Sequence, residues 1–127
     1  MAESDGSDKS IGGSIPASGP PTVEMLKDKT AYDAAIAATN GGPALIVDFT
    51  ATWCPPCKMI GPIFVQLASE NPTVTMKKVD VDENAEAAAA AGIQAMPTFK
   101  VYKDGAEVEQ MQGASKDGLA AMVAKYK

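Results

Sequence analysis

The sequence predicts an α/β fold, with a mixed sheet and helices on both of its faces. Strand-length apolar runs alternate with stretches of helical spacing, which is typical of crossover connections between parallel strands. Asp104-Gly105 separates the last two predicted strands and indicates a tight antiparallel hairpin. The chain has 127 residues, 46% of them hydrophobic, which is enough for one domain with a real core.

The first two elements precede a strong stop signal. Residues 22–26 (TVEML) form a short candidate strand. Residues 29–39 are predicted to be helical, because Tyr32 and Ile36 belong to a set of side chains at helical spacing. The turn-forming sequence Asn-Gly-Gly-Pro at 40–43 ends this helix.

A buried strand and a long helix follow. Residues 44–51 (ALIVDFTA) form an almost continuous apolar run, typical of a central strand buried on both faces, and only Asp48 interrupts it. A helix is predicted from the proline pair at 55–56 to Ser69, since the first turn of a helix tolerates proline. Pro62 lies inside this helix and is expected to kink it.

The rest of the domain adds three strands and two helices. The Ala-rich helix is expected to end at Gly92, and Ser115 is the predicted N-cap of the last helix. The predicted elements are a strand at 73–82, a helix at 83–92, strands at 98–103 and 106–113, and a helix at 115–127. The complete prediction is therefore five strands and four helices.

Residues 1–21 differ in composition from the rest of the chain. They are rich in Ser, Gly, Asp and Pro and bury too little apolar surface to offset their chain entropy. We therefore expect a disordered extension at 1–21 before a domain at 22–127. The extension lacks the apolar segment of a secretory signal and the Arg-rich composition of a transit peptide, so a cytoplasmic location is expected.

Charge and composition exclude several classes of function. The 16 acidic residues against 11 Lys and Arg give a net charge of −5, which argues against nucleic acid as a partner. No apolar run approaches the roughly 18 residues of a membrane-spanning helix, so no membrane partner is expected. The chain has no histidine, which removes histidine-based catalysis and most zinc sites.

Cys54 and Cys57 are the only cysteines in the chain. Their spacing lets them close a small disulfide ring on the first turn of the predicted helix. Cys54 lies at the helix start, where free N–H groups and the macrodipole favour the nucleophilic thiolate. Cys57 lies one turn further and is expected to resolve a mixed disulfide. The pair is a candidate redox centre.

Three other interpretations of this pair compete with redox chemistry. A structural disulfide in so small a ring restrains little chain entropy, and a cytosolic setting would keep it reduced. A zinc site needs two more Cys or His ligands, which the chain lacks, so no metal is expected. The third interpretation, two thiols that are adjacent by chance, stays open because spacing alone does not exclude it.

Five motifs within residues 22–127 resemble the thioredoxin family, and specifically its cytosolic eukaryotic members. They occur in the family's order and at its intervals. The motifs are VDFTATWCPPCKMIGP at 47–62, KVDVDEN at 78–84, MPTF at 96–99, KDG at 103–105 and QGA at 112–114. The resemblance implies a thioredoxin fold with a central mixed five-stranded sheet flanked by four helices.

The resemblance assigns catalytic roles to four residues. Cys54 would be the nucleophile and Cys57 the buried resolving thiol. Asp48 matches the family's buried aspartate, which accepts the proton of the resolving cysteine, and Lys78 matches the lysine near it. A carboxyl group in an apolar strand independently predicts a raised pKa for Asp48. The alternative for Asp48 is a strand-end side chain turned to solvent.

The resemblance also implies a shallow apolar rim that binds the target. Pro97 matches the family's cis-proline beside the cysteines, where the backbone pairs with an incoming peptide. The alternative is an ordinary trans proline that opens a strand. For Trp53 and Met96 the alternative is core packing. The rim residues would be Trp53, Pro55, Ala95, Met96, Pro97, Gly113 and Ala114.

The chain departs from the family pattern at two positions. Pro55 replaces the glycine that most commonly follows the first cysteine, although some plant cytosolic thioredoxins share the Pro-Pro pair. Pro55 removes one N–H group near the sulfur, which should weaken stabilisation of the thiolate. It also stiffens the loop, which alters the strain in the disulfide. Both effects act on the reduction potential. Thr50 stands where bacterial members carry a second tryptophan.

The resemblance implies a dithiol–disulfide oxidoreductase that reduces disulfides in target proteins, a redox protein of electron transport and cell redox homeostasis. A thioredoxin reductase drawing on NADPH would regenerate it, no cofactor would be bound, and the chain would act as a monomer. Two alternatives stay open. One is a disulfide isomerase-like oxidant, which normally carries a secretory signal and a histidine in the loop. The other is a non-catalytic binding subunit or chaperone.

Overall fold

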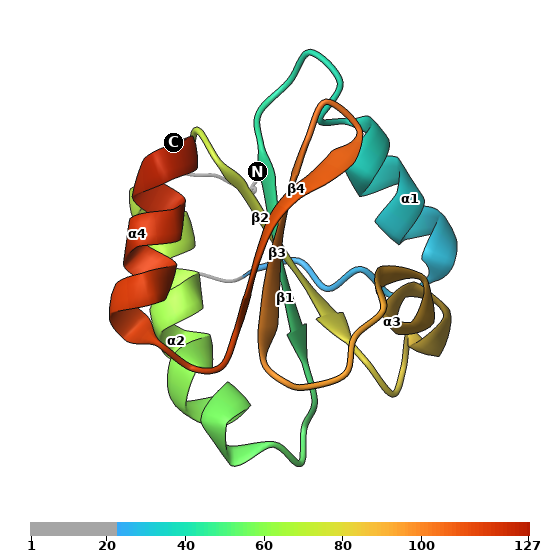
Figure 1. Cartoon of the computed structure of the whole chain (residues 1–127), viewed down its shortest axis with the longest axis vertical. Coiled ribbons are helices and arrows are strands. Elements are labelled where there is room, and N and C mark those ends of the chain that lie inside the picture. Colours follow the sequence, from blue (N-terminus) through green and yellow to red (C-terminus); the bar gives the residue numbers. More distant parts are fainter. Residues whose placement is uncertain (1–22) are drawn as a thin grey trace, which may run out of the picture.

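A computed structural model describes residues 23–127, and the predicted disorder of residues 1–21 lies outside this range. Four helices and four strands alternate as predicted from residue 29 onward (Figure 1). In chain order they are α1 (Lys29–Ala37), β1 (Leu45–Thr50), α2 (Pro55–Glu70), β2 (Thr75–Asp80), α3 (Ala85–Ala91), β3 (Thr98–Lys103), β4 (Ala106–Gln112) and α4 (Lys116–Tyr126).

The strands form one mixed sheet in the order β2-β1-β3-β4. β1 and β2 are parallel, while β3 runs antiparallel to both β1 and β4. The mixed α/β sheet is therefore confirmed. Its central strand β1 is hydrogen-bonded on both edges and is buried from Leu45 to Phe49, as the apolar run predicts.

The prediction of a fifth strand at 22–26 is wrong for the residues that the structure describes. Only an isolated parallel bridge joins Met25 to Lys78 at the outer edge of β2. Two backbone bonds make this contact: Leu26 N–H donates to Lys78 O at 2.8 Å, and Lys78 N–H donates to Glu24 O at 3.0 Å. The chain then leaves the sheet, because Asp28 caps α1 by accepting from Ala31 N–H.

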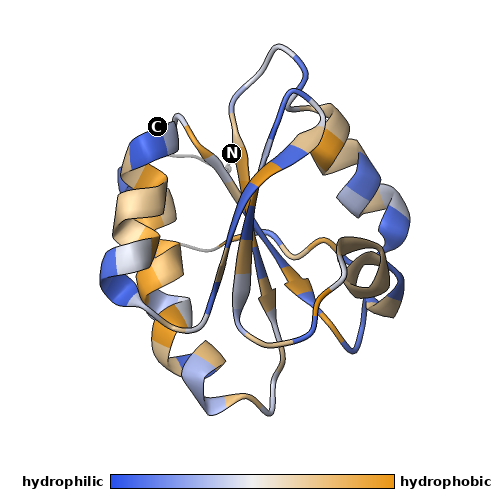
Figure 2. Ribbon diagram, viewed as in Figure 1, coloured by the Kyte–Doolittle hydropathy of each residue, from blue (hydrophilic) through white to orange (hydrophobic). Residues whose placement is uncertain are grey.

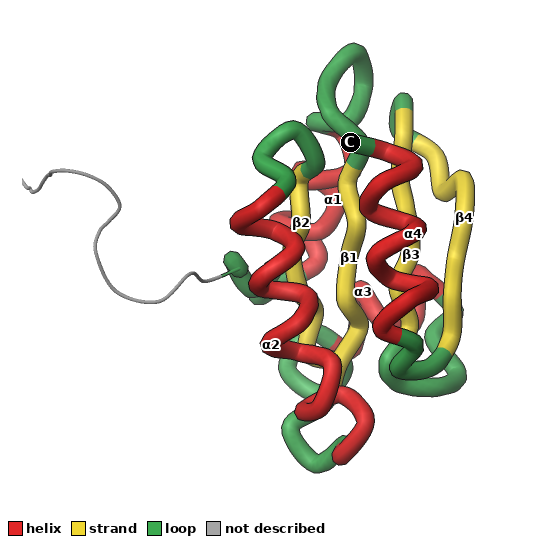
Figure 3. The backbone as a smooth tube through the Cα atoms, turned by 90° about the vertical axis from the view of Figure 1, so that its left-hand side faces the viewer, coloured by secondary structure: helices red, strands yellow, loops and turns green. Residues whose placement is uncertain are grey.

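The helices form two layers, α2 with α4 on one face of the sheet and α1 with α3 on the other (Figure 3). Each layer covers its own apolar cluster, and Figure 2 shows hydrophobic residues on the helices on both sides of the sheet. Side chains of β1 alternate between the two clusters: Leu45, Val47 and Phe49 pack toward α1 and α3, and Ile46 packs toward α2 and α4. The same alternation directs Asp48 toward α2.

Helix α2 begins where the proline pair predicts. Cys54 is its N-cap, with an extended backbone at φ −98° and ψ 109°, and the two prolines fill the first two helical positions. Ile60 and Phe64 anchor the helix in the core, where the Phe64 and Phe99 rings lie 5.7 Å apart. Pro62 lies inside the helix.

The predicted end of α3, the turn between β3 and β4 and the N-cap of α4 are confirmed. Gly92 ends α3 in the left-handed region at φ 70°, where a side chain would be strained. Asp104 and Gly105 form the hairpin turn between β3 and β4, both at positive φ. Ser115 caps α4, with its hydroxyl accepting from Gly118 N–H at 3.0 Å.

We expect Ser115→Ala to lower the free energy of unfolding by ~1 kcal/mol, because the N-terminal N–H groups of α4 lose their acceptor. Ser115→Asp is the matched control, since a carboxylate caps as well and also suits the helix dipole. Urea unfolding of the oxidised protein measures both. Equal stability of the two variants would show that the cap contributes nothing here.

Candidate active site

The site lies at one edge of the sheet, where two parallel strands end and an antiparallel strand begins. β1 ends at Thr50, β2 ends at Asp80, and β3 starts at Thr98. Ligand and catalytic groups commonly gather at the carboxyl ends of parallel strands. The short loop after β1 carries the chain directly into α2, at the lower end of Figure 1.

Cys54 and Cys57 form a disulfide across the first turn of α2, with their Cα atoms 5.3 Å apart. Both residues are buried, and they pack with Ala51, Val81 and Met96 in a small cluster. Cys54 Sγ accepts a hydrogen bond from Cys57 N–H at 3.3 Å, as the side chain of an N-cap does. The same N–H group would stabilise a thiolate at Cys54 after reduction.

Asp48 is only 1% exposed, so its side chain does not turn to solvent. Its Oδ1 atom is buried and has no hydrogen-bond partner, and no ion pair within residues 23–127 involves this carboxyl. Burial raises the pKa of Asp48 to about 7, against a smaller lowering by the charge of Lys78. Lys78 is the register neighbour of Asp48 on the adjacent parallel strand.

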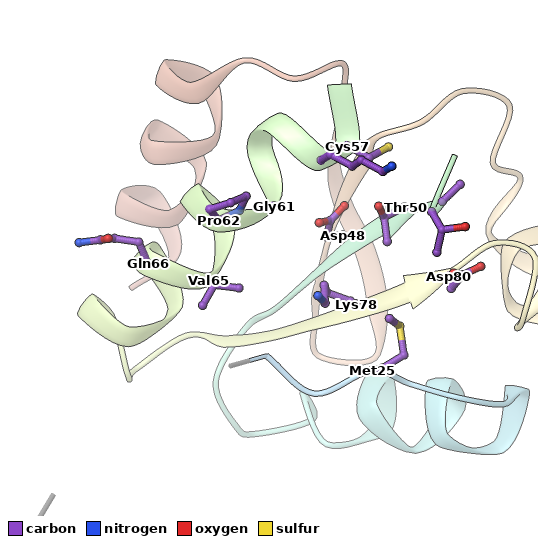
Figure 4. Close-up of a pocket in the computed structure, with 13 residues that line it drawn as sticks. Met25, Asp48, Thr50, Cys57, Gly61, Pro62, Val65, Gln66, Lys78 and Asp80 are labelled. Carbon is purple, nitrogen blue, oxygen red and sulfur yellow. The ribbon is translucent and has the colours of Figure 1, made fainter. Parts of the chain in front are cut away.

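A pocket of about 770 Å³ joins these groups. Asp48, Cys57 and Lys78 all line it, together with the α2 residues Lys58, Gly61, Pro62, Val65 and Gln66. Figure 4 shows the Asp48 side chain between those of Cys57 and Lys78. The pocket thus places a carboxyl group that titrates near neutrality beside the buried cysteine, with a cation behind it.

Backbone from two separate loops surrounds the disulfide. The Met96–Pro97 peptide bond is cis, and Met96 O lies 3.8 Å from Cys54 Sγ. Gly113 N–H donates to Pro97 O at 2.9 Å, which ties the loop after β4 to the loop before β3. Gly113 has φ 97°, a conformation that suits glycine.

The side chains predicted for the rim lie in different environments. Trp53 is 61% exposed, so core packing does not account for it. Pro55 and Ala95 are also exposed. Met96 packs against the cysteine cluster, and Ala114 packs against the cluster beneath α2 and α4.

Sequence reasoning missed Asp82 and Asp80. Trp53 Nε1–H donates to Asp82 Oδ2 at 2.8 Å, across a sequence separation of 29 residues. Asp80 is buried at the end of β2, and its Oδ1 accepts from Asp82 N–H at 2.8 Å. The alternating acids of the VDVD sequence were the available signal, but spacing alone does not show that their loop meets Trp53.

Within residues 23–127, no group of three or more His, Cys, Asp or Glu side chains is placed to hold a metal ion. No helix in this range is both long and apolar enough to span a membrane.

Comparisons with known proteins agree with this geometry. The family model described as Thioredoxin matches residues 22–125. A thioredoxin H-type from Chlamydomonas reinhardtii is 50% identical over 107 residues, which cover 83% of this chain and 95% of that protein. The crystal structure of thioredoxin NaTrxh from Nicotiana alata is similar, with a TM-score of 0.80, 35% identity, and coverage of 88% of this chain and 98% of that one.

A third similarity comes from a structural study of the thiol resolving mechanism in yeast mitochondrial 1-Cys peroxiredoxin via glutathione/thioredoxin systems. The matching chain has a TM-score of 0.75 and 33% identity, and the match covers 82% of this chain and 95% of that one.

The raised pKa of Asp48 predicts that this carboxyl opposes folding as the pH rises. Below pH 3.8 both the folded and unfolded states are protonated, so the effect is absent. Between pH 3.8 and about 7 the unfolded chain loses a proton that the folded protein keeps, and above this range the penalty is constant. The interval corresponds to about 4 kcal/mol at 1.36 kcal/mol per pH unit.

We therefore expect Asp48→Ala to gain stability over the native sequence as the pH rises from 4 to 8. The cavity left by the carboxyl adds a cost that does not depend on pH. Asp48→Asn keeps the side-chain shape and should show the same pH dependence. Denaturant unfolding of the oxidised forms across this range measures the difference, and a difference that stays constant with pH would contradict the assignment.

Proposed function

Because the chain belongs to the thioredoxin family, we propose that it reduces disulfides in target proteins by thiol–disulfide exchange. The Cys54–Cys57 disulfide itself supports dithiol–disulfide oxidoreductase activity. The observation that carries the proposal is the placement of this pair on the first turn of α2, with Cys57 lining the same pocket as the buried carboxyl of Asp48.

The reaction begins at Cys54. Its thiolate attacks one sulfur of the target disulfide, forms a mixed disulfide, and releases the other target sulfur as a thiolate, which takes up a proton. The N-terminal position in α2 supports this role, since the Cys57 N–H group and the helix dipole favour negative charge on the sulfur.

Cys57 completes the exchange. Its thiolate attacks Cys54 Sγ, closes the Cys54–Cys57 bond, and releases the second target sulfur, so two electrons pass to the target. Cys57 is buried and must first lose its proton. Asp48 lines the same pocket, and a carboxyl with a pKa of about 7 can accept that proton at neutral pH. Lys78 favours the carboxylate form of Asp48, which is the form that accepts the proton.

The target binds over the rim around Cys54. Exposed Trp53, Pro55 and Ala95 offer apolar surface, and the Met96 backbone beside Pro97 offers an acceptor for strand-like pairing. Gly113 and Ala114 close the opposite side. The hydrogen bond from Gly113 to Pro97 supports this joint role of the two loops.

Regeneration requires a second protein. We assign this step to a thioredoxin reductase that draws electrons from NADPH, with no cofactor bound to the chain itself. The protein then acts as a cytoplasmic monomer in electron transport and redox homeostasis. Peroxiredoxins are one candidate class of target, given the similarity to the chain from the peroxiredoxin study.

The assay that tests this function combines the full chain with thioredoxin reductase, NADPH and insulin. If the chain reduces protein disulfides, NADPH oxidation depends on both the chain and insulin, and the reduced insulin precipitates. A chain that instead oxidises reduced substrates, or that binds without turnover, fails this assay and contradicts the proposal.

The different roles proposed for Cys54 and Cys57 predict how single variants behave. Cys57→Ser should trap mixed disulfides with target proteins, because the nucleophile remains while the resolving thiol is lost. Cys54→Ser should trap few, since its remaining thiol is buried. Gels run without reductant measure the trapped species, and equal trapping by both variants would show that the roles are misassigned.

A further inference from the structure

Trp53 is the only tryptophan in the chain and is 61% exposed beside the disulfide. An exposed indole on a short loop needs an anchor if it is to present one fixed face to a target. Among the described residues, its polar contact is the hydrogen bond from Nε1–H to Asp82 Oδ2, at 2.8 Å. The position of Trp53 therefore depends on the position of Asp82.

Asp82 is itself exposed and lies in the turn between β2 and α3. Asp80 holds this turn by accepting hydrogen bonds from its backbone. Its Oδ1 accepts from Asp82 N–H at 2.8 Å and from Glu83 N–H at 3.1 Å, and its backbone O accepts from Asn84 N–H at 2.9 Å. Three successive N–H groups thus converge on one residue.

Asp80 is suited to this task because it is 6% exposed and is the last residue of β2. Its neighbour in the parallel register is Thr50, the last residue of β1, so its backbone is fixed by the sheet. No ion pair within residues 23–127 uses its carboxylate. Its hydrogen bonds go to the turn. An oxygen acceptor at the same position could make the same bonds without the negative charge.

We propose that Asp80 is a positioning residue that fixes the side chain of Trp53, the residue next to Cys54, acting through the backbone of Asp82. A rigid strand end sets the turn, the turn aims the Asp82 carboxylate, and that carboxylate holds the indole. The consequence for target binding rests on the proposed reductase function; the consequence for Trp53 itself does not. Among the described residues, the hydrogen bonds of Asp80 go to the turn and not to either sulfur.

Two variants at this position separate geometry from charge. Asp80→Ala removes the acceptor for both N–H groups. Asp80→Asn keeps an oxygen at the same place but removes the negative charge. The Asp80→Asn variant is needed because Asp80 also lines the pocket that contains Asp48 and Lys78. Loss of its negative charge could act on those two groups rather than on the turn.

The first readout is the fluorescence of Trp53, which the single tryptophan makes unambiguous. Asp80→Ala should lower the fluorescence anisotropy and raise acrylamide quenching, while Asp80→Asn keeps both at the native values. Asp82→Ala, an exposed change that does not threaten folding, should reproduce the Asp80→Ala signal. The double variant should add nothing to Asp82→Ala, because both changes release the same bond.

The second readout is reduction of insulin with reductase and NADPH. Asp80→Ala should raise KM by roughly fivefold, the factor that corresponds to ~1 kcal/mol for a lost cap. The value of kcat should change less, because the cysteines and Asp48 keep their places. Asp80→Asn should restore the native KM.

Three results would overturn the proposal. They are a native Trp53 signal in Asp80→Ala, a defect in Asp80→Asn as large as that in Asp80→Ala, and additive fluorescence changes in the double variant. If the native chain fails to reduce insulin, the proposed function fails, yet the fluorescence series still decides whether Asp80 positions Trp53.

Discussion

Burial of the Asp48 carboxyl in the central strand is the constraint on which the site depends. β1 has hydrogen-bonded neighbours on both edges and helices over both faces, so a side chain in its middle cannot reach bulk water. A carboxyl group held there resists ionisation and opposes folding at neutral pH. The same burial gives it a pKa suited to taking a proton from Cys57. Under the proposed function, Asp48 lowers stability at the position where the proton acceptor is needed, as is common at functional sites.

The surrounding structure keeps this arrangement rigid. Cys54 lies at a helix start fixed by two prolines, and the opposing loops are tied by the bond from Gly113 to Pro97. At the far end of the sheet, the buried Thr39 hydroxyl accepts from Gly105 N–H at 2.8 Å and so holds the hairpin to the end of α1. Hydrogen bonds thus join loops at both ends of the sheet, and the candidate active site lies at strand ends and a helix start.

Local patterns in the sequence predicted most of the fold. The apolar run around Asp48, the stop at Gly92 and the Asp104-Gly105 turn each depend on neighbours in the chain, and the structure has all three. Within residues 23–127 the predicted fifth strand is reduced to a bridge at Met25, because five residues of suitable composition do not show how long the chain stays beside β2.

Contacts between distant segments were the harder part. Lys100 is 4% exposed in an apolar strand, and it is tolerated because Glu107, across the hairpin, lies 2.7 Å from its Nζ atom. The bond between Trp53 and Asp82 is similar, since it exists only once β1 and β2 are paired in register. Residue types and spacing identified the cysteines and Asp48, whereas the groups that orient them required the tertiary structure.

The reduction potential of the Cys54–Cys57 pair is the most direct test of the central claim, that this chain donates electrons to target disulfides. Equilibration with a defined dithiothreitol or glutathione buffer, followed by thiol alkylation, measures it. A reductase should have a value near that of thioredoxin, about −270 mV, even with Pro55 between the cysteines. A value in the range of disulfide oxidants, roughly −180 to −120 mV, would contradict the account and indicate a protein that forms or rearranges disulfides.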